Sequence, residues 1–451
     1  MSLNETNSFP SEKPKVHGLL SASYRAIWRW HFYAGLAVLP ILCLMALTGG
    51  LYLFKDEVDA AIYAKYSKVE PAAQSASPDA WVRAAEKAVP GRASNVFVSA
   101  STNEAIKLTV DLHDGSMRTV FVNPASAQVT GVTRFGGVME TVKGLHSLSI
   151  VGQWANYIVE IVAGWAIILI ATGTYLWWPR KRNVGVLKLS ATDHRARPFW
   201  RDFHAITGFY AGGIILFLAV TGMPWSAFWG AQFGEFVRTQ QIGRPQAPPA
   251  ASAFVHAKHP DVPLGVGWTM EAMVMPHHHT GHASLDTVIK AADNAKMAKP
   301  YRVSIPKTSG VAFTVAHDAK QVENTRILYV DGSSGVVKAD IQYEAFGIGA
   351  KAFEWGIAVH QGTQYGRVNQ LIMLGGCVAV WLLAISGTIM WWKRRPNGRL
   401  GAPPAPYIAR GKYALLCIVL PLGLLFPLTG LSLLAVLGLD FGYRTIRRHY
   451  S

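Results

Sequence analysis

Long apolar stretches alternate with polar segments along the chain, and five of these stretches are long enough to cross a membrane. A membrane-spanning helix needs about 20 predominantly apolar residues. The pattern therefore predicts spans at residues 30–54, 156–178, 204–229, 368–392 and 413–439. A polar leader, residues 1–29, precedes the first span and is too long for a signal peptide, so we expect an uncleaved anchor. Pro421 and Pro427 predict that the fifth span is bent or re-entrant.

Two long segments between the spans, residues 55–145 and 230–359, carry mixed patterns. The pattern is helical at residues 78–89 and 284–295 and strand-like at residues 95–99, 105–112, 118–122, 311–316 and 326–330. Each segment therefore combines a helix with short strands. The predicted fold class is a membrane protein, mainly an α-helical bundle with duplicated helix pairs, plus two small α+β modules.

Charged residues are scarce and mostly basic. Only 16% of the residues are charged and 50% are hydrophobic, whereas soluble domains carry about 25% charged residues. This composition excludes a disordered chain and fits a protein with several segments in lipid. The net charge of +16 is concentrated in the leader and in the connections at residues 179–203 and 393–412. We interpret it as a topology signal that places these segments in the cytoplasm, and we expect no nucleic-acid partner.

Because the basic connections are expected in the cytoplasm, the two α+β modules are expected on the opposite side of the membrane, in the periplasm. Trp177-Trp178 and Trp391-Trp392 precede the basic connections and are expected at the cytoplasmic interface, where tryptophan is enriched. The C-terminal tail, residues 440–451, is also basic but falls on the periplasmic side if the fifth span crosses fully. The topology of that span and of the tail is therefore left open.

The chain repeats itself in one orientation. The first and third spans share a pattern that matches His31 with His204 and Thr48-Gly49 with Thr221-Gly222. The segments 146–178 and 360–392 share another, which matches His146 with His360, Thr172-Gly173-Thr174 with Ser386-Gly387-Thr388, and Trp177-Trp178 with Trp391-Trp392. We therefore expect two halves related by an axis along the membrane normal.

The four repeated histidines are the candidate chemistry. Side chains that can ionise or bind metals are rare at membrane depth and usually functional. His31 and His204 are expected at the cytoplasmic side, and His146 and His360 at the periplasmic side. Each pair can supply two imidazoles to a six-coordinate haem iron, facing each other across the bundle. Thr48 follows His31 on one helix by about 26 Å of rise, so two haems would form an electron path across the bilayer.

Less specific interpretations stay open. A single histidine at a helix end is most often interfacial or a cap, although a two-fold repeat makes four such accidents less probable. Pairing within each half is an alternative, but the histidines of one half lie at opposite faces of the membrane. Arg29 and Arg201 lie next to the inner pair and are candidates to hold haem propionates. Gly35 and Gly208 are candidates for close approach of a flat macrocycle.

Cysteine limits the choice of cofactor. Cys43, Cys377 and Cys417 lie in apolar runs, and no Cys-x-x-Cys-His motif is present. Covalent haem attachment and a thiolate iron–sulfur cluster are therefore excluded. Any redox cofactor must be held noncovalently.

A second cluster lies in the second module. It contains Met270, Met273, Met275, His277, His278, His279 and His282. Thioethers and imidazoles suit copper, and imidazole alone suits zinc or iron. The four histidines are weaker metal candidates than the repeat histidines, because a solvated histidine-rich loop also binds metals adventitiously.

Several motifs together resemble the PepSY-associated transmembrane family. They are Trp30-His31-Phe-Tyr-Ala-Gly, Leu145-His146, Thr172-Gly-Thr-Tyr-Leu-Trp-Trp-Pro-Arg, Arg201-Asp-Phe-His204 and Thr221-Gly-Met-Pro-Trp-Ser. The resemblance covers nearly the whole chain. It implies an iron-regulated protein of the bacterial inner membrane with PepSY modules in the periplasm. Some such proteins are ferric-siderophore reductases with two b-type haems, and the histidines of both pairs match the family histidines.

The expected function is a dihaem reductase in contact with membrane lipid. An electron would enter at the His31/His204 haem, pass to the His146/His360 haem and reduce a periplasmic ferric-siderophore, which releases Fe(II) for iron acquisition. No pyridine-nucleotide or flavin fingerprint is visible, so the donor would be a cytoplasmic protein or a membrane quinol. The alternatives are a periplasmic cupric reductase that uses the Met/His cluster, a metal or haem transporter, and a PepSY protein that binds a protease.

Overall fold

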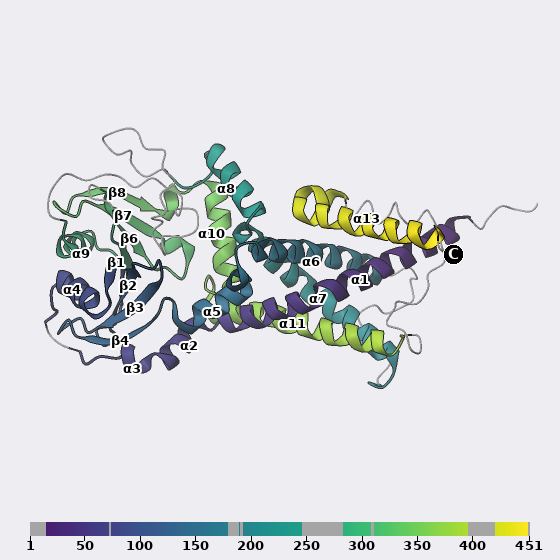
Figure 1. Cartoon of the computed structure of the whole chain (residues 1–451), viewed down its shortest axis with the longest axis horizontal. Helices are drawn as coiled ribbons and strands as arrows, with labels where there is room; N and C mark the ends of the chain where they lie inside the picture. The colour runs from purple at the N-terminus through teal and green to yellow at the C-terminus, as the bar shows by residue number, and fades with distance from the viewer. Residues whose placement is uncertain are drawn as a thin grey trace, which may run out of the picture. The chain divides into compact units, whose positions relative to one another are not determined.

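The computed structural model describes residues 15–71, 74–178, 189, 193–245, 283–307, 311–395 and 420–449 (Figure 1). The chain divides into two compact units. The helical unit consists of Met1–Ala46, Gln153–Trp229 and Gly375–Ser451. The sheet unit consists of Leu47–Gly152 and Gly230–Leu374. Both units are assembled from separated pieces of the sequence, as the alternation of spans and modules predicts.

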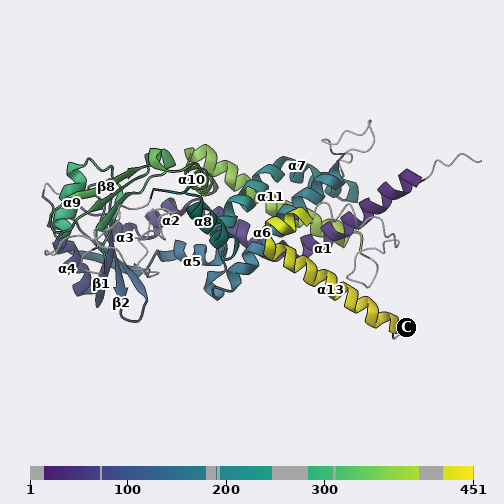
Figure 2. The same ribbon diagram turned by 90° about the horizontal axis from the view of Figure 1, so that it is seen from above.

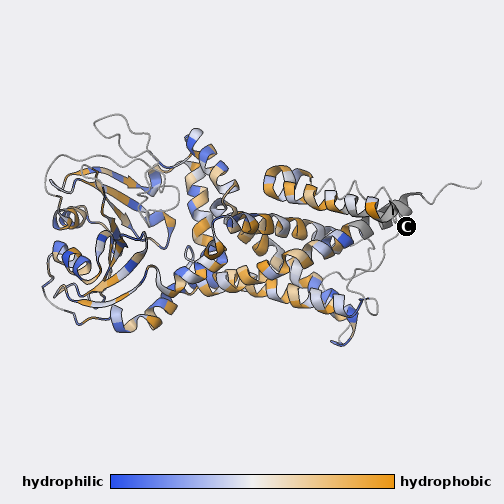
Figure 3. Cartoon of the chain, in the orientation of Figure 1, coloured by the Kyte–Doolittle hydropathy of each residue, from blue (hydrophilic) through white to orange (hydrophobic). Residues whose placement is uncertain are grey.

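Among the described residues, four helices are long and apolar enough to cross a membrane, and they match the positions of the first four predicted spans. They are α1 (Lys15–Tyr52), α6 (Ala155–Trp177), α7 (Arg197–Gly222) and α11 (Gly366–Trp392), and Figure 3 shows how frequent hydrophobic residues are along them. Helix α7 begins with Pro198 in its first turn, a position where proline needs no hydrogen-bond partner. His204 therefore lies about two turns inside the helix and not at its start. His31 likewise lies well inside α1.

The fifth predicted span is interrupted. The described residues 420–425 are helical, the helix is interrupted at Phe426, and α13 (Pro427–His449) follows, with an apolar part at Pro427–Leu439. Proline lacks an N–H and clashes with the preceding turn, so a break before Pro427 is expected. This apolar part is shorter than the other four candidate spans.

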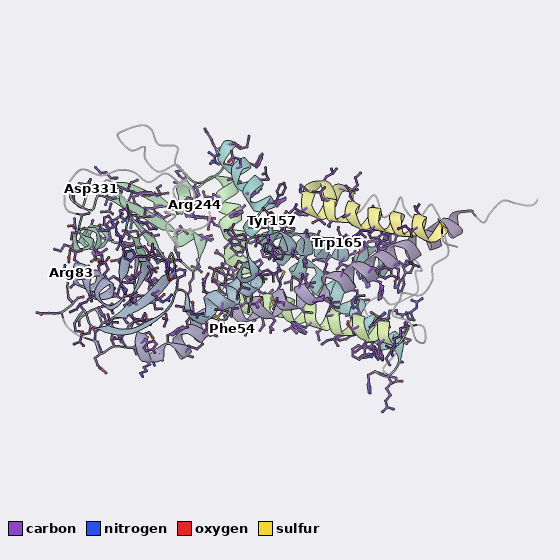
Figure 4. All side chains as sticks on the ribbon, in the orientation of Figure 1. Phe54, Arg83, Tyr157, Trp165, Arg244 and Asp331 are labelled. Atoms are coloured by element: carbon purple, nitrogen blue, oxygen red, sulfur yellow. The ribbon has the colours of Figure 1, made fainter. Side chains whose placement is uncertain are left out.

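Helix α13 packs along α6 (Figure 1). Trp165 of α6, labelled in Figure 4, donates a hydrogen bond from Nε1 to Ser432 Oγ over 3.0 Å. Next to Trp165, a Cβ atom at Gly164 would overlap the side chain of Thr429, which lies one turn before Ser432 on α13. Small residues allow such close helix approach where lipid provides no hydrophobic driving force.

The eight strands that the structure describes in the sheet unit form one antiparallel sheet (Figures 1 and 2). They are β1 (Gly91–Val98), β2 (Ile106–Leu112), β3 (Met117–Val122), β4 (Val129–Arg134), β5 (Tyr301–Ser304), β6 (Phe313–His317), β7 (Arg326–Val330) and β8 (Val337–Gln342). Their order is β4-β3-β2-β1-β5-β6-β7-β8. The two predicted α+β segments are thus joined edge to edge through β1 and β5.

Two helices, α4 (Pro78–Ala88) and α9 (Leu285–Asn294), cover one face of the sheet (Figure 2). Both match the helices predicted from the pattern. The core between helices and sheet includes Val96, Leu108, Val303 and Leu328, all fully buried. Ser77 caps α4 by accepting a hydrogen bond from the Ala80 N–H. The alternation of apolar residues along the strands places them on this face.

Polar contacts close the seam between the two halves of the sheet. Ser304 Oγ of β5 donates to Asn95 Oδ1 of β1 over 2.8 Å, and both residues are buried. At the start of the two helices, the Asp79 carboxylate accepts from Ser284 Oγ over 2.6 Å and from the Leu285 N–H over 2.8 Å. Asp79 of one half therefore binds the first residues of α9 in the other half.

Asp286 lies beside Asp79, and the two carboxyls affect each other. Burial opposes ionisation of Asp79, but hydrogen bonds from Ser284 and Asp286 outweigh it and lower the pKa of Asp79. Burial and the hydrogen bond to Asp79 raise the pKa of Asp286. Arg83 and Lys290 are the nearby cations. Since folding raises the pKa of Asp286, the protonated carboxyl adds to the free energy of unfolding below the ordinary aspartate pKa. This contribution is lost as the pH rises through the pKa of the folded state.

Asp286→Asn is therefore expected to stabilise the protein at pH 7 and to change little near pH 3. The amide keeps a donor toward Asp79 but carries no charge at any pH. Because both carboxyls are largely solvated, the gain is expected to stay below about 1 kcal/mol. Unfolding of the purified full chain, followed from pH 3 to pH 7, measures it. Asp318→Asn, in a weak exposed pair with Arg302, is the control, and a gain that is the same at both pH values contradicts the prediction.

Candidate functional site

The structure brings His31 and His204 together in the helical unit. His31 lies on α1 and His204 on α7. The centroids of their imidazole rings are 6.4 Å apart, and the ring planes are almost perpendicular, at 87°. The inner pair predicted from the repeat is therefore present as a pair of facing rings.

Each ring is fixed by a hydroxyl group from another helix. His31 Nδ1 lies 2.9 Å from Thr172 Oγ1 on α6, and His204 Nδ1 lies 3.0 Å from Ser386 Oγ on α11. Both hydroxyls donate their hydrogen to the carbonyl four residues earlier in their own helix, over 2.7 and 2.6 Å. A hydroxyl has one hydrogen, so each must accept from the histidine Nδ1–H. The neutral ring then presents the lone pair of Nε2, which is the atom that binds a metal.

The distance between the rings fits one iron ion. When two imidazoles bind one metal ion from opposite sides, each ligand nitrogen lies about 2 Å from the metal, and each ring centre lies about 1 Å beyond its nitrogen. The two ring centroids are then about 6 Å apart. The observed 6.4 Å agrees with this sum. Two opposed neutral imidazoles are the donor set of a six-coordinate b-type haem. The residues present therefore fit the predicted cofactor.

Two glycines make room for the histidines. A Cβ atom at Gly173 would lie 3.2 Å from His31 Cε1, and one at Gly387 would lie 3.7 Å from His204 Cε1. The glycines suggested from the sequence have a different role. A Cβ atom at Gly35 or Gly208 would lie against the side chain of Leu169 or Leu383, at 3.9 and 3.6 Å. Those two positions therefore pack helix against helix.

The outer histidines are neighbours in the sheet unit. His146 ends α5 (Gly137–His146), and His360 ends α10 (Ile348–His360). Both lie on separate helices that precede the spans. His146 Nδ1 shares a hydrogen bond of 3.1 Å with Oγ1 of the buried Thr48. Burial and the charge of nearby His146 lower the pKa of His360 to about 3, so this ring is neutral and able to bind a metal at physiological pH.

The two arginines predicted to hold propionates have local partners. The Arg29 guanidinium lies over the Tyr33 ring, 5.9 Å from its centroid. Arg201 forms an ion pair of 2.6 Å with Asp202, and its side chain is 59% exposed. A propionate contact for Arg201 would share the guanidinium with Asp202, whereas Arg29 is turned toward its own helix.

The Met/His cluster, which includes His277, His278, His279 and His282, lies outside the described residues. Within the part of the chain that the structure describes, no group of three or more His, Cys, Asp or Glu residues could hold a metal ion. Cys43 is buried and Cys377 is half-buried, and both are free thiols. Cys417 is not among the described residues.

Three functional side chains were not assigned from the sequence. Thr172 and Ser386 occupy matching positions in the repeat, and each is followed by a glycine. This repeated hydroxyl was the feature of the sequence that could have identified them as partners of the histidines. Glu160 is 1% exposed within α6. Its Oε2 accepts from the backbone N–H groups of Phe228 and Trp229, both at 3.1 Å, and its Oε1 has no partner among the described residues. A charged side chain within an apolar span was the signal for Glu160.

Comparison with protein families gives one result. The model of the PepSY-associated TM region matches residues 28–394. The matched range contains all four histidines and the hydroxyl groups that bind them. Comparison with curated proteins finds no match.

Proposed function

The chain belongs to the family of the PepSY-associated TM region, and from this membership and the paired histidines we propose that it is a dihaem b-type reductase of the bacterial inner membrane. Its sheet unit would face the periplasm and its basic connections the cytoplasm. The observation that carries the proposal is the inner pair, in which two neutral imidazoles face each other at the spacing of a shared iron.

The chain supplies ligands, orientation and exclusion of water. His31 and His204 would bind one haem iron, and His146 and His360 a second. When bound, b-type haems supply one-electron redox chemistry. The hydroxyls of Thr172 and Ser386 hold the inner rings in one orientation and make their Nε2 atoms more basic ligands. The apolar span helices would keep the inner site in a medium of low dielectric.

The proposed substrate is a ferric-siderophore or another ferric chelate. Each Fe(III) takes up one electron and becomes Fe(II), which hard oxygen chelators bind more weakly. The metal is then released for uptake. The donor is a cytoplasmic protein or a membrane quinol, because the sequence carries no nucleotide or flavin fingerprint. Cupric reduction and metal transport rest on the sequence alone, since the Met/His cluster lies outside the described residues.

The test is a visible spectrum of the purified full chain, followed by a reduction assay. We expect a Soret band and two haems per chain. Chemically reduced protein, mixed without oxygen with a ferric-siderophore, is expected to reoxidise while a chromogenic chelator captures Fe(II). The same mixture with Cu(II) tests the copper alternative, and transport by proteoliposomes tests the transporter. A chain that is folded but carries no haem contradicts the proposal.

Thr172→Val is expected to weaken haem binding at the inner pair by about 10–100-fold, which is the usual effect of losing a partner of a metal-bound histidine. The midpoint potential of that haem should rise, because a less basic imidazole stabilises Fe(III) less. Haem dissociation into an excess of a haem-binding protein and a redox titration measure both effects.

Thr174→Val is the matched control, since Thr174 bonds only to the Ile170 carbonyl of its own helix. Ser386→Ala should act on His204 as Thr172→Val acts on His31. An unchanged potential in both variants would show that the hydroxyls do not tune the ligands.

A further inference from the structure

Three arginines gather at one end of the helical unit. Arg197 and Arg201 lie in the first two turns of α7, and Arg394 follows the end of α11. Lys393 Nζ donates to the Arg195 carbonyl over 2.8 Å, so the residues after α11 lie against the start of α7, where the charges of Arg394 and Arg201 act on Arg197. Arg201 pairs with Asp202, whereas Arg197 and Arg394 form no ion pair with any residue that the structure describes. Neighbouring like charges repel, so the cluster is complementary to an anion with at least two negative groups.

The cluster lies on the helix faces that carry the inner histidines. Arg197, Arg201 and His204 follow one another by four and three residues, so they share a face of α7. Arg394 lies just past the end of α11, the helix that carries Ser386, whose hydroxyl contacts His204. On α1, Trp28 lies one turn before His31. The Arg394 guanidinium stacks over the Trp28 ring, 4.7 Å from its centroid. Three of the four helices that carry or orient the imidazoles, α1, α7 and α11, therefore also bring the arginines together.

The spacing along α7 suits a ligand with a core at the histidines and carboxylates at one edge. Arg201 lies about 5 Å and Arg197 about 10 Å from His204 in helix rise. A guanidinium binds a carboxylate with two parallel hydrogen bonds, and this geometry favours arginine over lysine. Arg394 has its plane fixed against Trp28, which lowers the entropy lost when it binds a ligand.

We propose that Arg197, Arg201 and Arg394 form a dicarboxylate site that receives the propionates of the porphyrin held by His31 and His204. The inference rests on the proposed function and refines it. It assigns Arg197 and Arg394, which the sequence did not single out, and it removes Arg29, which stacks on Tyr33. The site would thus direct the propionate edge of the porphyrin toward the end of the helical unit that carries these arginines.

The test compares haem with its dimethyl ester, which has the same ring and iron but no carboxylates. Apoprotein is prepared from the full-length His360→Ala variant in detergent, so that the inner pair is the intact site, and is titrated with each porphyrin. We expect haem to bind on the order of 100-fold more tightly than the ester, as two charge-assisted contacts predict. The Arg197→Gln/Arg394→Gln double variant, made in this background, should lose most of that preference. Arg395→Gln is the control, because Arg395 stacks on Trp392 beside the cluster.

Each outcome separates the inference from the function on which it rests. If the native chain binds neither porphyrin, the proposed function fails and this site fails with it. If haem and ester bind equally, or if the double variant keeps the full preference, the propionate site is wrong while the reductase stands. If the double variant changes only the affinity for phosphatidylglycerol over phosphatidylcholine nanodiscs, the arginines bind lipid phosphate and the proposal is overturned.

Discussion

His31→Ala is expected to reduce the haem content of the purified chain from two to about one and to remove the six-coordinate spectrum of the inner site. The variant deletes one of two opposed iron ligands and leaves a cavity between α1 and α7. His204 remains held by Ser386 and can bind iron on one side only, so any haem that stays becomes five-coordinate. Haem extraction and spectra of both oxidation states measure the two effects.

The same argument predicts that the two inner ligands act as a unit. His204→Ala should reproduce the loss caused by His31→Ala, and the double variant should be hardly worse than either single variant. His113→Ala is the control, since His113 is an exposed residue of the sheet unit. A His31→Ala protein that keeps two six-coordinate haems would remove the basis of the proposed function.

The apolar pattern was sufficient to predict the four span helices, because a membrane requires long uninterrupted runs whose length needs no tertiary information. The repeat was sufficient to predict that His31 faces His204. Equivalent positions in duplicated helices tend to meet at the axis between them. In the structure the ring of His31 lies next to that of His204, and His146 lies near His360.

The strands were harder to predict. Strand β4 contains Gly131 and no buried residue, and β5 has four residues, so neither has a clear alternating pattern. The pairing of β1 with β5 joins residues about 200 positions apart. Register between such distant segments depends on complementary faces and not on any local signal. The continuous sheet was therefore not visible in the sequence.

The partners of the histidines were also not predictable. Thr172 and Ser386 were visible as a repeated hydroxyl, but a hydrogen bond depends on which rotamer points across the helix interface. The arginines illustrate the same limit. Arg29 is adjacent to the inner pair in sequence, yet Arg197 and Arg394 converge because helical turns bring them to the same end. Sequence proximity to a histidine therefore predicted the neighbouring arginines less well than a shared helix face does.

Arg244→Ala is expected to lower the free energy of unfolding by about 3–5 kcal/mol, which is the usual cost of breaking a buried ion pair by removing one partner. The Arg244 side chain, labelled in Figure 4, is 1% exposed and the Glu354 side chain 11%. Their N–O distance is 2.6 Å, and the guanidinium also stacks on Phe346 at 4.4 Å. Removal of Arg244 leaves the Glu354 carboxylate buried without this countercharge.

The effect should reach the outer histidine pair. Glu354 lies on α10, which ends with His360, so loosening this helix moves a proposed iron ligand. Unfolding by denaturant and the stability of the outer haem are the two measurements. Arg326→Ala is the control, because the Arg326–Asp340 pair has a similar N–O distance of 2.7 Å but is 24% and 35% exposed, and its loss should cost less than about 1 kcal/mol.

A double variant separates charge from packing. Arg244→Met/Glu354→Met removes both charges and keeps apolar volume, so it should be far more stable than Arg244→Ala and close to the native chain. If Arg244→Ala costs no more than Arg326→Ala, the pair is solvated in solution and does not hold α10. If the double variant is as unstable as Arg244→Ala, the stacking of Arg244 on Phe346 stabilises α10, and the charge of Glu354 contributes little.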